Sequence, residues 1–404
     1  MKIPSYIPVG ISEEVTEVIQ RANNDTRNKV PYSIYDYMYA FPSSQKLYNR
    51  MMFTSLLVNQ YKADKMRKKT AREKLWQAQN GMSLLSTSSL PLNNSLYRQQ
   101  AYKYLTEAEK MLRSDGNFTE SVTCFDYDND GIDEYVCRME QYFAYISLAG
   151  GSVPELDVIK NCFNYADNLK RHFEYDGYDD SYERGLFIDH LFTNSQLDLY
   201  VRGEPAGDGV FSRIQYSQLK YSGQHHEIQL AARAVWKPTG QAVYLRKKYV
   251  INSTGMYVQY IIKNESDKPL IAKFAVESNI SDISFVSTKK SGFSIETVDN
   301  GNVVSLDTEK STQELNHKGK LNNVQIVRLS DKPNGISFVF EPNEKCSYCH
   351  TPIRFNRPGF DQKNIESVNL TYASALFWDI NIEPGRETEK SINFTIIPVK
   401  KIKN

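Results

Sequence analysis

Two kinds of hydrophobic periodicity divide this chain of 404 residues. Up to about residue 115, apolar residues recur at helical spacing and glycine is scarce. From about Ser121 onward, short runs of alternating apolar and polar residues are broken by Gly, Asn, Asp and Pro, which is typical of β-strands. The polar stretch Ser114–Asn117 separates the two patterns. We therefore predict a helical domain over residues 1–116 and a β-domain over residues 117–404.

The first part predicts three helices. Ser12 precedes an apolar periodic run and can cap a first helix. Ser43 or Ser44 can cap a second, longer helix that continues to Leu75. The third helix is expected over Leu96–Leu112.

The second part predicts many short strands. Two of their connections, Asn252–Gly255 and Asn264–Asp267, are short and polar, as hairpin loops should be. Strands at this spacing indicate a large antiparallel β-sandwich rather than a βαβ fold. The fold class is therefore predicted to be α+β, a helical bundle segment followed by this sandwich. The expected strands are Tyr135–Ile146, Ile228–Val235, Ala242–Val250, Met256–Ile262, Leu270–Val276, Val324–Leu329, Ile336–Phe340 and Ile392–Pro398.

The segment Asp126–Glu134, here called the acidic loop, carries the clearest local chemistry. Aspartates occupy every second position, Gly131 allows the chain to turn, and a further carboxylate ends the segment. A hard cation such as Ca²⁺ prefers oxygen ligands of this kind. We predict a structural calcium site whose ligands are Asp126, Asp128, Asp130, the carbonyl of Ile132, and Glu134.

The acidic loop differs from an EF-hand, because its twelfth position is Cys137 instead of glutamate and strands are expected on both sides. Calcium-binding loops between strands do use this pattern. The alternative interpretation is an acidic turn whose aspartates accept hydrogen bonds from their own backbone.

Charge and composition narrow the class of protein. The formal net charge of +1 argues against a nucleic-acid-binding protein, because no basic field is available to neutralise phosphates. No apolar run is long enough to span a bilayer, and the acidic segment Ser12–Glu17 is unlike the apolar core of a signal peptide. Five cysteines fit reduced thiols better than a disulfide framework, so we expect a cytoplasmic protein.

The segment Cys346–His350 matches the c-type haem attachment pattern, but the lack of a second such site and the strand-like composition around it argue against haem. A zinc site would need a fourth ligand that no other part of the sequence supplies. We therefore expect ordinary reduced cysteines near the end of a strand. The six histidines show no metal-ligand spacing, and the sequence contains no phosphate-binding loop or nucleophile elbow, so no catalytic residue is predicted.

Several helical segments resemble the family 57 glycoside hydrolases, the α-amylase and 4-α-glucanotransferase group. Ile7–Gly10 is similar to the segment at the exit from that family's barrel. Phe41–Met51 resembles the helix start Y-P-E-S-N-x-M-H-K-R-M. Leu75–Gly81 and Tyr97–Glu109 are similar to the two helical segments that follow.

The β-domain carries the stronger part of the resemblance. After the acidic loop, Gly150–Asp157 and Asn164–Glu174 match in order, the latter resembling N-x(4)-L-x-R-x-x-E. Arg184–His190 resembles R-x-x-F-x-D-H, and Phe274–Ile280 resembles the strand F-x-V-E-x-N-l. The resemblance implies a sandwich similar to the galactose-mutarotase-like supersandwich.

Three stretches of the family pattern are missing or reduced. The family's catalytic glutamate and aspartate belong to an N-terminal barrel, and no segment of this sequence corresponds to it. The family's aromatic-His-Gly stretch, which reaches toward the sugar, is replaced by Gly81–Ser86. A further family stretch survives only as Pro352-Ile353 and Gly359–Asp361.

The resemblance therefore implies a non-catalytic carbohydrate-associated protein. It would bind α-glucan or maltooligosaccharide, or assist a separately encoded catalytic barrel. One alternative is a structural or interaction protein that has lost sugar binding. Another is an active glycoside hydrolase or 4-α-glucanotransferase fragment. The sequence selects no sugar-binding residues.

Overall fold

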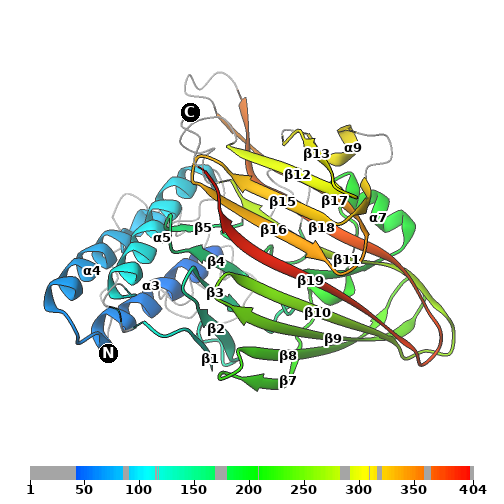
Figure 1. Ribbon diagram of the computed structural model, residues 1–404, viewed down its shortest axis with the longest axis horizontal. Coiled ribbons are helices and arrows are strands. Elements are labelled where there is room, and N and C mark those ends of the chain that lie inside the picture. Colours follow the sequence, from blue (N-terminus) through cyan, green and yellow to red (C-terminus); the bar gives the residue numbers. More distant parts are fainter. Residues whose placement is uncertain are drawn as a thin grey trace, which may run out of the picture. The chain divides into compact units, whose positions relative to one another are not determined.

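The chain forms two compact units, Met1–Phe118 and Thr119–Asn404, in the computed structural model (Figure 1). The structure describes residues 42–84, 91–113, 116, 118–168, 180–207, 209–282, 292–308, 310–315, 321–358 and 365–400. The helix predicted after Ser12 lies outside these residues. Helices are confined mostly to the first unit and antiparallel sheets to the second, so the predicted α+β class is confirmed.

The first unit contains three helices, α3 (Pro42–Gln60), α4 (Lys65–Ala78) and α5 (Pro91–Arg113). The sequence predicts one helix through Leu75, whereas the structure ends α3 at Gln60 and begins α4 after Asp64. The Asp64 carboxylate caps α4 by accepting hydrogen bonds from the backbone N–H groups of Met66 and Arg67. Their apolar faces share one core: Leu47, Met51, Val58, Ala71, Leu75, Ala78, Ala101, Tyr102, Leu105, Ala108 and Leu112.

A buried ion cluster joins α3 to α5. Arg50 lies 2.7 Å from one carboxylate oxygen of Glu109, and Arg113 lies 2.6 Å from the other. Arg50 also donates to the hydroxyl of Thr54. Because an unpaired charge in this position would be strongly destabilising, the cluster fixes how the two helices pair.

The second unit contains three antiparallel sheets. The first has the order β1-β2-β3-β4-β5, the second β13-β12-β15-β16-β19-β10-β9-β8-β7, and the third β14-β17-β18-β11-β6. The strands of the first are β1 (Ser121–Phe125), β2 (Glu134–Arg138), β3 (Tyr142–Ile146), β4 (Glu155–Val158) and β5 (Phe163–Asn164).

The nine-stranded sheet contains most of the strands predicted from the sequence. The predicted strand Tyr135–Ile146 proves to be two, β2 and β3, which pair as a hairpin. The predicted strand Val324–Leu329 also falls on two strands, the end of β14 (Leu321–Val324) and most of β15 (Ile326–Asp331). The strands of this sheet are β7 (Ser217–Ser222), β8 (Glu227–Trp236), β9 (Gln241–Asn252), β10 (Gly255–Asn264), β12 (Phe293–Asp299), β13 (Asn302–Leu306), β15 (Ile326–Asp331), β16 (Ile336–Pro342) and β19 (Glu387–Pro398). The third sheet contains β6 (Ile188–Phe192), β11 (Leu270–Ser281), β14 (Leu321–Val324), β17 (Cys346–Pro358) and β18 (Ile365–Ile382).

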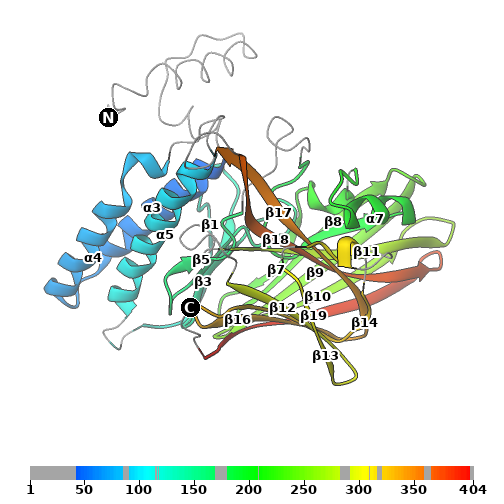
Figure 2. The ribbon, with the colours of Figure 1, turned by 90° about the horizontal axis from the view of Figure 1, so that it is seen from above.

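The third sheet is covered on both faces. One face contributes to the main apolar core together with the nine-stranded sheet, as Phe274 and Trp378 show. The short helix α7 (Asn194–Val201) packs on the other face, on the side away from the nine-stranded sheet (Figure 2). β11 is therefore buried on both sides along most of its length, which is why its polar residues must find partners inside the protein. None of the described helices is long and apolar enough to cross a membrane.

A buried ion pair connects β6 of the third sheet to β9 of the nine-stranded sheet. The Lys247 ammonium lies 2.8 Å from a carboxylate oxygen of Asp189 and also donates to the carbonyl of Phe187. The Tyr216 hydroxyl donates to the same carboxylate oxygen at 2.8 Å. Both charged side chains are fully buried, and burial lowers the pKa of Lys247, an effect that the Asp189 carboxylate offsets only in part. The pair therefore anchors β6 inside the sandwich.

We expect Lys247→Met to lower the free energy of unfolding by about 3–5 kcal/mol, because Asp189 would remain as an unpaired buried carboxylate. Urea unfolding followed by circular dichroism measures this change. The matched control is Lys248→Met, whose ion pair with Glu227 is partly exposed and which should change stability by less than about 1 kcal/mol. Equal effects of the two substitutions would contradict the anchoring role.

Candidate functional site

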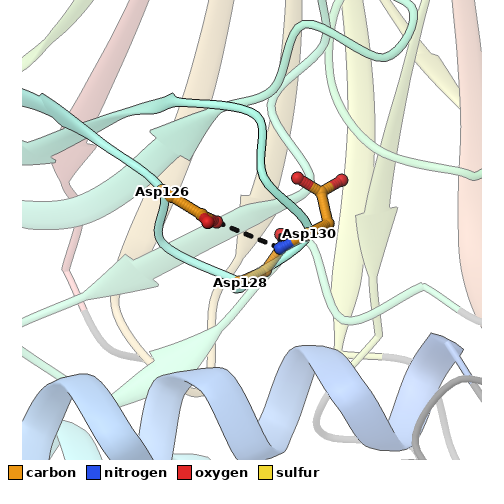
Figure 3. A group of neighbouring side chains, drawn as sticks. All are labelled: Asp126, Asp128 and Asp130. Atoms are coloured by element: carbon orange, nitrogen blue, oxygen red, sulfur yellow. Dashed lines mark hydrogen bonds between the residues drawn. The ribbon is translucent and has the colours of Figure 1, made fainter.

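The acidic loop connects β1 to β2 and carries three aspartates on one turn (Figure 3). The side chains of Asp126, Asp128 and Asp130 each offer a carboxylate oxygen, and these oxygens lie within 4.8 Å of one another. Asp126 and Asp128 are half-buried, and Asp130 is exposed. The structure thus brings together three of the five ligands that the sequence predicts.

Backbone geometry holds the acidic loop in this shape. Asn129 and Gly131 have positive φ angles of 61° and 89°, which turn the chain back on itself. As a result, the backbone N–H groups of Asp130 and Gly131 donate to the two carboxylate oxygens of Asp126 at 3.1 and 3.0 Å. These are the backbone contacts of an acidic turn, and they fix the orientation of the Asp126 carboxylate.

The remaining two predicted ligands have different surroundings. Glu134 begins β2 and is buried, and its carboxylate accepts a hydrogen bond from the backbone N–H of Tyr127 at 2.9 Å. It does not belong to the group of oxygens within 4.8 Å of one another. The N–H of Ile132 donates to Asp130 at 2.7 Å, and the role of its carbonyl stays a prediction.

The carboxylates of the acidic loop repel one another. Burial, followed by the charge of Asp130, raises the pKa of Asp128 to about 6. Burial, followed by the charge of Asp128, raises the pKa of Glu134 to about 8. A divalent cation would offset both effects, and an all-oxygen donor set suits Ca²⁺.

The raised pKa of Glu134 predicts a pH dependence of stability in the presence of a chelator. Between its ordinary value of 4.5 and about 8, the folded chain retains the proton and the unfolded chain has lost it. Stability should therefore fall as pH rises through this window. Urea unfolding at a series of pH values should give a flatter profile for Glu134→Gln, which has no proton to lose. Parallel profiles for the two proteins would contradict the raised pKa.

A second candidate site is a cleft beside α7, with a volume of about 110 Å³. Aromatic rings and charged groups from separate parts of the sandwich share it, and helix α7 contributes Tyr200. Its lining residues are Asp180, Ser181, Tyr182, Arg184, His190, Phe192, Tyr200, Gly203, Glu204, Pro205, Ala206, Gly207, Arg213, Thr351, Ile353 and Ala373.

Local sequence explains how α7 comes to lie over the cleft. Thr193 follows β6 directly and caps α7 through a capping box with Gln196. The Thr193 hydroxyl accepts from the N–H of Gln196 at 3.2 Å, and the Gln196 side chain accepts from the N–H of Thr193 at 3.0 Å. This sharp start turns the chain from strand to helix within one residue. Tyr200, in the second turn of the helix, then reaches the sheet.

The buried carboxylate of Glu277, on β11, organises the polar groups around the cleft. One of its oxygens accepts from Arg184 at 3.1 Å and from Asn279 at 2.7 Å. The other accepts from the hydroxyls of Tyr182 and Tyr200 at 2.6 and 2.8 Å, and it lies 3.1 Å from Nε2 of His190. Burial alone would raise the pKa of Glu277, but the hydrogen bond with His190 and the charge of Arg184 hold it well below its usual range. Glu277 is therefore ionised and fully engaged.

His190 is positioned on both sides of its ring. Strand pairing places His190 opposite Ala275, on the same face as Glu277, while Asp189 points to the opposite face. The His190 ring stacks on Phe192, with centroids 5.0 Å apart and planes at 13°. Its Nδ1 atom is buried and has no hydrogen-bond partner among the described residues. A side chain at Gly209 would place its Cβ 2.1 Å from Nδ1, so only glycine fits there.

Four residues of the polar network behind this cleft come from two segments that carry the sequence resemblance. Arg184 and His190 belong to the first of them, and Glu277 and Asn279 to the second. Asp180 completes the set by accepting two hydrogen bonds from Arg184, at 2.6 and 2.8 Å. Both segments can be recognised in the sequence, but no local pattern predicts that they meet. Tyr182 and Tyr200 could not be selected from the sequence either, because composition shows only a general excess of tyrosine.

The cysteine segment Cys346–His350 forms part of β17. Both of its cysteines are buried, and burial raises the pKa of Cys346 to about 12. The His350 side chain accepts or donates at Nδ1 to the Thr312 hydroxyl, 2.9 Å away. Protonated, buried thiols of this kind are packing residues.

The fold of this chain is similar to those of several solved structures. The crystal structure of 4-alpha-glucanotransferase from Thermococcus litoralis is similar, with a TM-score of 0.68 and 17% sequence identity over 98% of this chain. This chain spans only 58% of that protein's length. A galactose mutarotase-like protein from Lactobacillus casei and a putative aldose 1-epimerase from Escherichia coli K12 also match. The first has a TM-score of 0.41 and 8% identity, and the match covers 65% of this chain and 100% of that protein. The second has a TM-score of 0.41 and 11% identity, and the match covers 66% of this chain and 99% of that protein.

No curated protein matched the sequence. The family model for the C-terminal domain of alpha-amylase/4-alpha-glucanotransferase matches residues 126–176 and 177–355, more than half of the chain. The matched region begins at the acidic loop and contains Arg184, His190 and Glu277. The chain is a member of the alpha-amylase/4-alpha-glucanotransferase C-terminal family.

Proposed function

We propose that the protein is a non-catalytic carbohydrate-binding member of this family, and that it binds a neutral α-glucan in the cleft beside α7. The observation that carries the proposal is the combination of tyrosine rings with a buried polar network at one cleft. Tyr182 and Tyr200 supply rings for the apolar face of a sugar. The Glu277 carboxylate behind the cleft holds both rings in place by accepting a hydrogen bond from each hydroxyl.

The state of the carboxylates supports binding rather than hydrolysis. A glycosidase needs one acid that can donate a proton and a second carboxylate that is free to act. Here Glu277 accepts from five groups and has a lowered pKa, and Asp180 is held by two hydrogen bonds from Arg184. Glu277 therefore has no proton to donate, and both of its oxygens already accept hydrogen bonds.

Titration calorimetry with maltotriose tests the cleft directly. Ala206 lines it and is half-buried, so Ala206→Trp should fill the space and weaken this binding by at least about tenfold. The matched control is Val303→Trp, on the exposed strand β13, which should bind as the wild type does. Unchanged binding by Ala206→Trp, or no binding by the wild type, would reject the cleft as the site.

A product assay addresses the alternative that the chain is itself an active glycoside hydrolase or 4-α-glucanotransferase. Incubation of the isolated chain with maltoheptaose should give no shorter or longer products by chromatography. Products that disappear in Glu277→Gln would overturn the non-catalytic assignment.

We further propose that a separately encoded catalytic chain is a partner of this protein. The first unit exposes Met52 and Leu56 on one face of α3, with 45% and 52% of their surfaces accessible. Residues four apart lie side by side on a helix, so they form a small apolar surface. A neighbouring reading frame for the barrel part would support this proposal. Met52→Glu should weaken assembly with that chain. If the protein is purely structural, the substitution should have no effect on assembly.

We also propose calcium as a structural ligand of the acidic loop, held by Asp126, Asp128 and Asp130 with Glu134 nearby. Calcium there would neutralise the repelling carboxylates and tie β1 to β2. None of the five cysteines forms a disulfide, which supports a reducing, cytoplasmic location.

Calcium should raise the thermal midpoint of the wild type relative to a sample with chelator. Binding at 100 times the dissociation constant contributes about 2.7 kcal/mol to stability. Asp128→Asn removes one carboxylate and should abolish most of this shift. Asp267→Asn, in the exposed loop between β10 and β11, is the matched control and should retain it. A wild type that shows no calcium-dependent shift would reject the site.

A further inference from the structure

The helices of the first unit are strongly basic, although the chain as a whole is nearly neutral. Over residues 42–84 and 91–113 the sequence contains thirteen lysines and arginines but only four aspartates and glutamates. The whole chain, by contrast, contains 49 basic and 48 acidic residues. A charge imbalance of this size, confined to one unit, favours an anionic partner for that unit.

Helix α4 carries the largest share of this charge. Six of its fourteen residues are lysine or arginine, and Glu73 is its only acidic residue. Of the six, Lys65, Lys69 and Arg72 form no ion pair or hydrogen bond through their side chains with any residue in the described part of the chain. The other three have partners within the unit, namely Arg67 with Asp64, Lys68 with the carbonyls of Asn59 and Tyr61, and Lys74 with Glu107.

The three unpaired cations share one face of α4 with Trp76, and this face is here called the basic stripe. Lys65, Lys69, Arg72 and Trp76 are at positions i, i+4, i+7 and i+11, which recur on the same side of an α-helix. The basic stripe extends roughly 16 Å along the helix axis. The buried residues of α4 lie on another side of the helix, so the stripe faces away from the core. Glu73 adjoins it as a single carboxylate against three cations.

Two large apolar side chains accompany these charges. Trp76 exposes 62% of its surface. Met66 exposes 70%, and it precedes Lys69 by three residues, so it adjoins the basic stripe. An indole, with an apolar ring and a polar N–H, is suited to the boundary between water and an apolar layer. The stripe therefore combines cations with groups that can enter such a layer.

The geometry of the basic stripe selects the kind of anion. Its cations project from the outside of one helix and are spread along the axis, so they do not converge on a single small anion. An extended anionic surface can contact all of them at once. The outside of a nucleic-acid duplex offers phosphates and sugars, whereas an anionic bilayer offers phosphates together with an apolar layer for Trp76 and Met66.

We propose that the basic stripe of α4 docks the protein on an anionic lipid bilayer. Lys65, Lys69 and Arg72 contact headgroup phosphates, and Trp76 and Met66 enter the interfacial layer. The contact is peripheral and requires no membrane-spanning helix. It is also independent of the proposed sugar binding, because it uses none of the residues of the cleft beside α7.

Co-sedimentation of the full chain with lipid vesicles tests this docking. Vesicles of equimolar phosphatidylcholine and phosphatidylglycerol should bind the wild type at low salt, and vesicles of phosphatidylcholine alone should not. Lys69→Gln should weaken this binding about fivefold, because each cation near an anionic surface contributes separately to the attraction. Trp76→Ala should weaken it as well. The matched control is Lys103→Gln, at an exposed position of α5, which should bind as the wild type does.

Tryptophan fluorescence reports on the basic stripe itself. Trp76 is the accessible tryptophan, since Trp236 and Trp378 expose only 1% and 4% of their surfaces. Its emission should move to shorter wavelength on the anionic vesicles, and inorganic phosphate should neither cause this shift nor compete with it. Equal losses for Lys103→Gln and Lys69→Gln, or an unshifted emission on the vesicles, would overturn the docking. So would tighter binding to a DNA duplex or to polyglutamate than to the vesicles.

Discussion

Strand β6 carries charged or ionisable groups on both of its faces, and each face is buried. Asp189 points into the main core, where Lys247 and Tyr216 engage it. His190, the next residue, points to the opposite face, where Glu277 engages it. Because both faces are buried, loss of a partner on either face would destabilise the fold. These contacts therefore fix the register of the strand and its position inside the sandwich. The cleft beside α7 depends on this constraint, because its polar groups are positioned from β6 and β11.

The structure builds the cleft from its buried layer outward. Glu277 forms the innermost layer and accepts hydrogen bonds from Arg184 and Asn279 within the sandwich. Two tyrosines donate to it from the side of the cleft. The tyrosines are therefore oriented by the carboxylate that they shield. Packing of α7 on the sheet closes the set, with Phe192 and Phe377 in the same apolar cluster. A ligand would meet rings and hydroxyls that are already in place, which lowers the entropic cost of binding.

Sequence reasoning was most successful where the chemistry is contiguous. The acidic loop could be read directly, because its three aspartates are neighbours along the chain and need only a local turn to converge. Strand alternation likewise revealed the sandwich. The break between α3 and α4 was readable from Asp64, a good helix cap, but the continuous apolar pattern concealed it. The Glu277 network was beyond reach, since Arg184 and Glu277 are 93 residues apart and meet only through strand pairing.

The many hydrogen bonds to the Glu277 carboxylate limit how this position can change during evolution. Five donors stabilise its charged form. No single substitution would free both oxygens and also restore an ordinary affinity for protons. An evolutionary path toward acid–base chemistry at this position would have to pass through destabilised intermediates. Selection for folding alone is therefore enough to keep this carboxylate in its charged form.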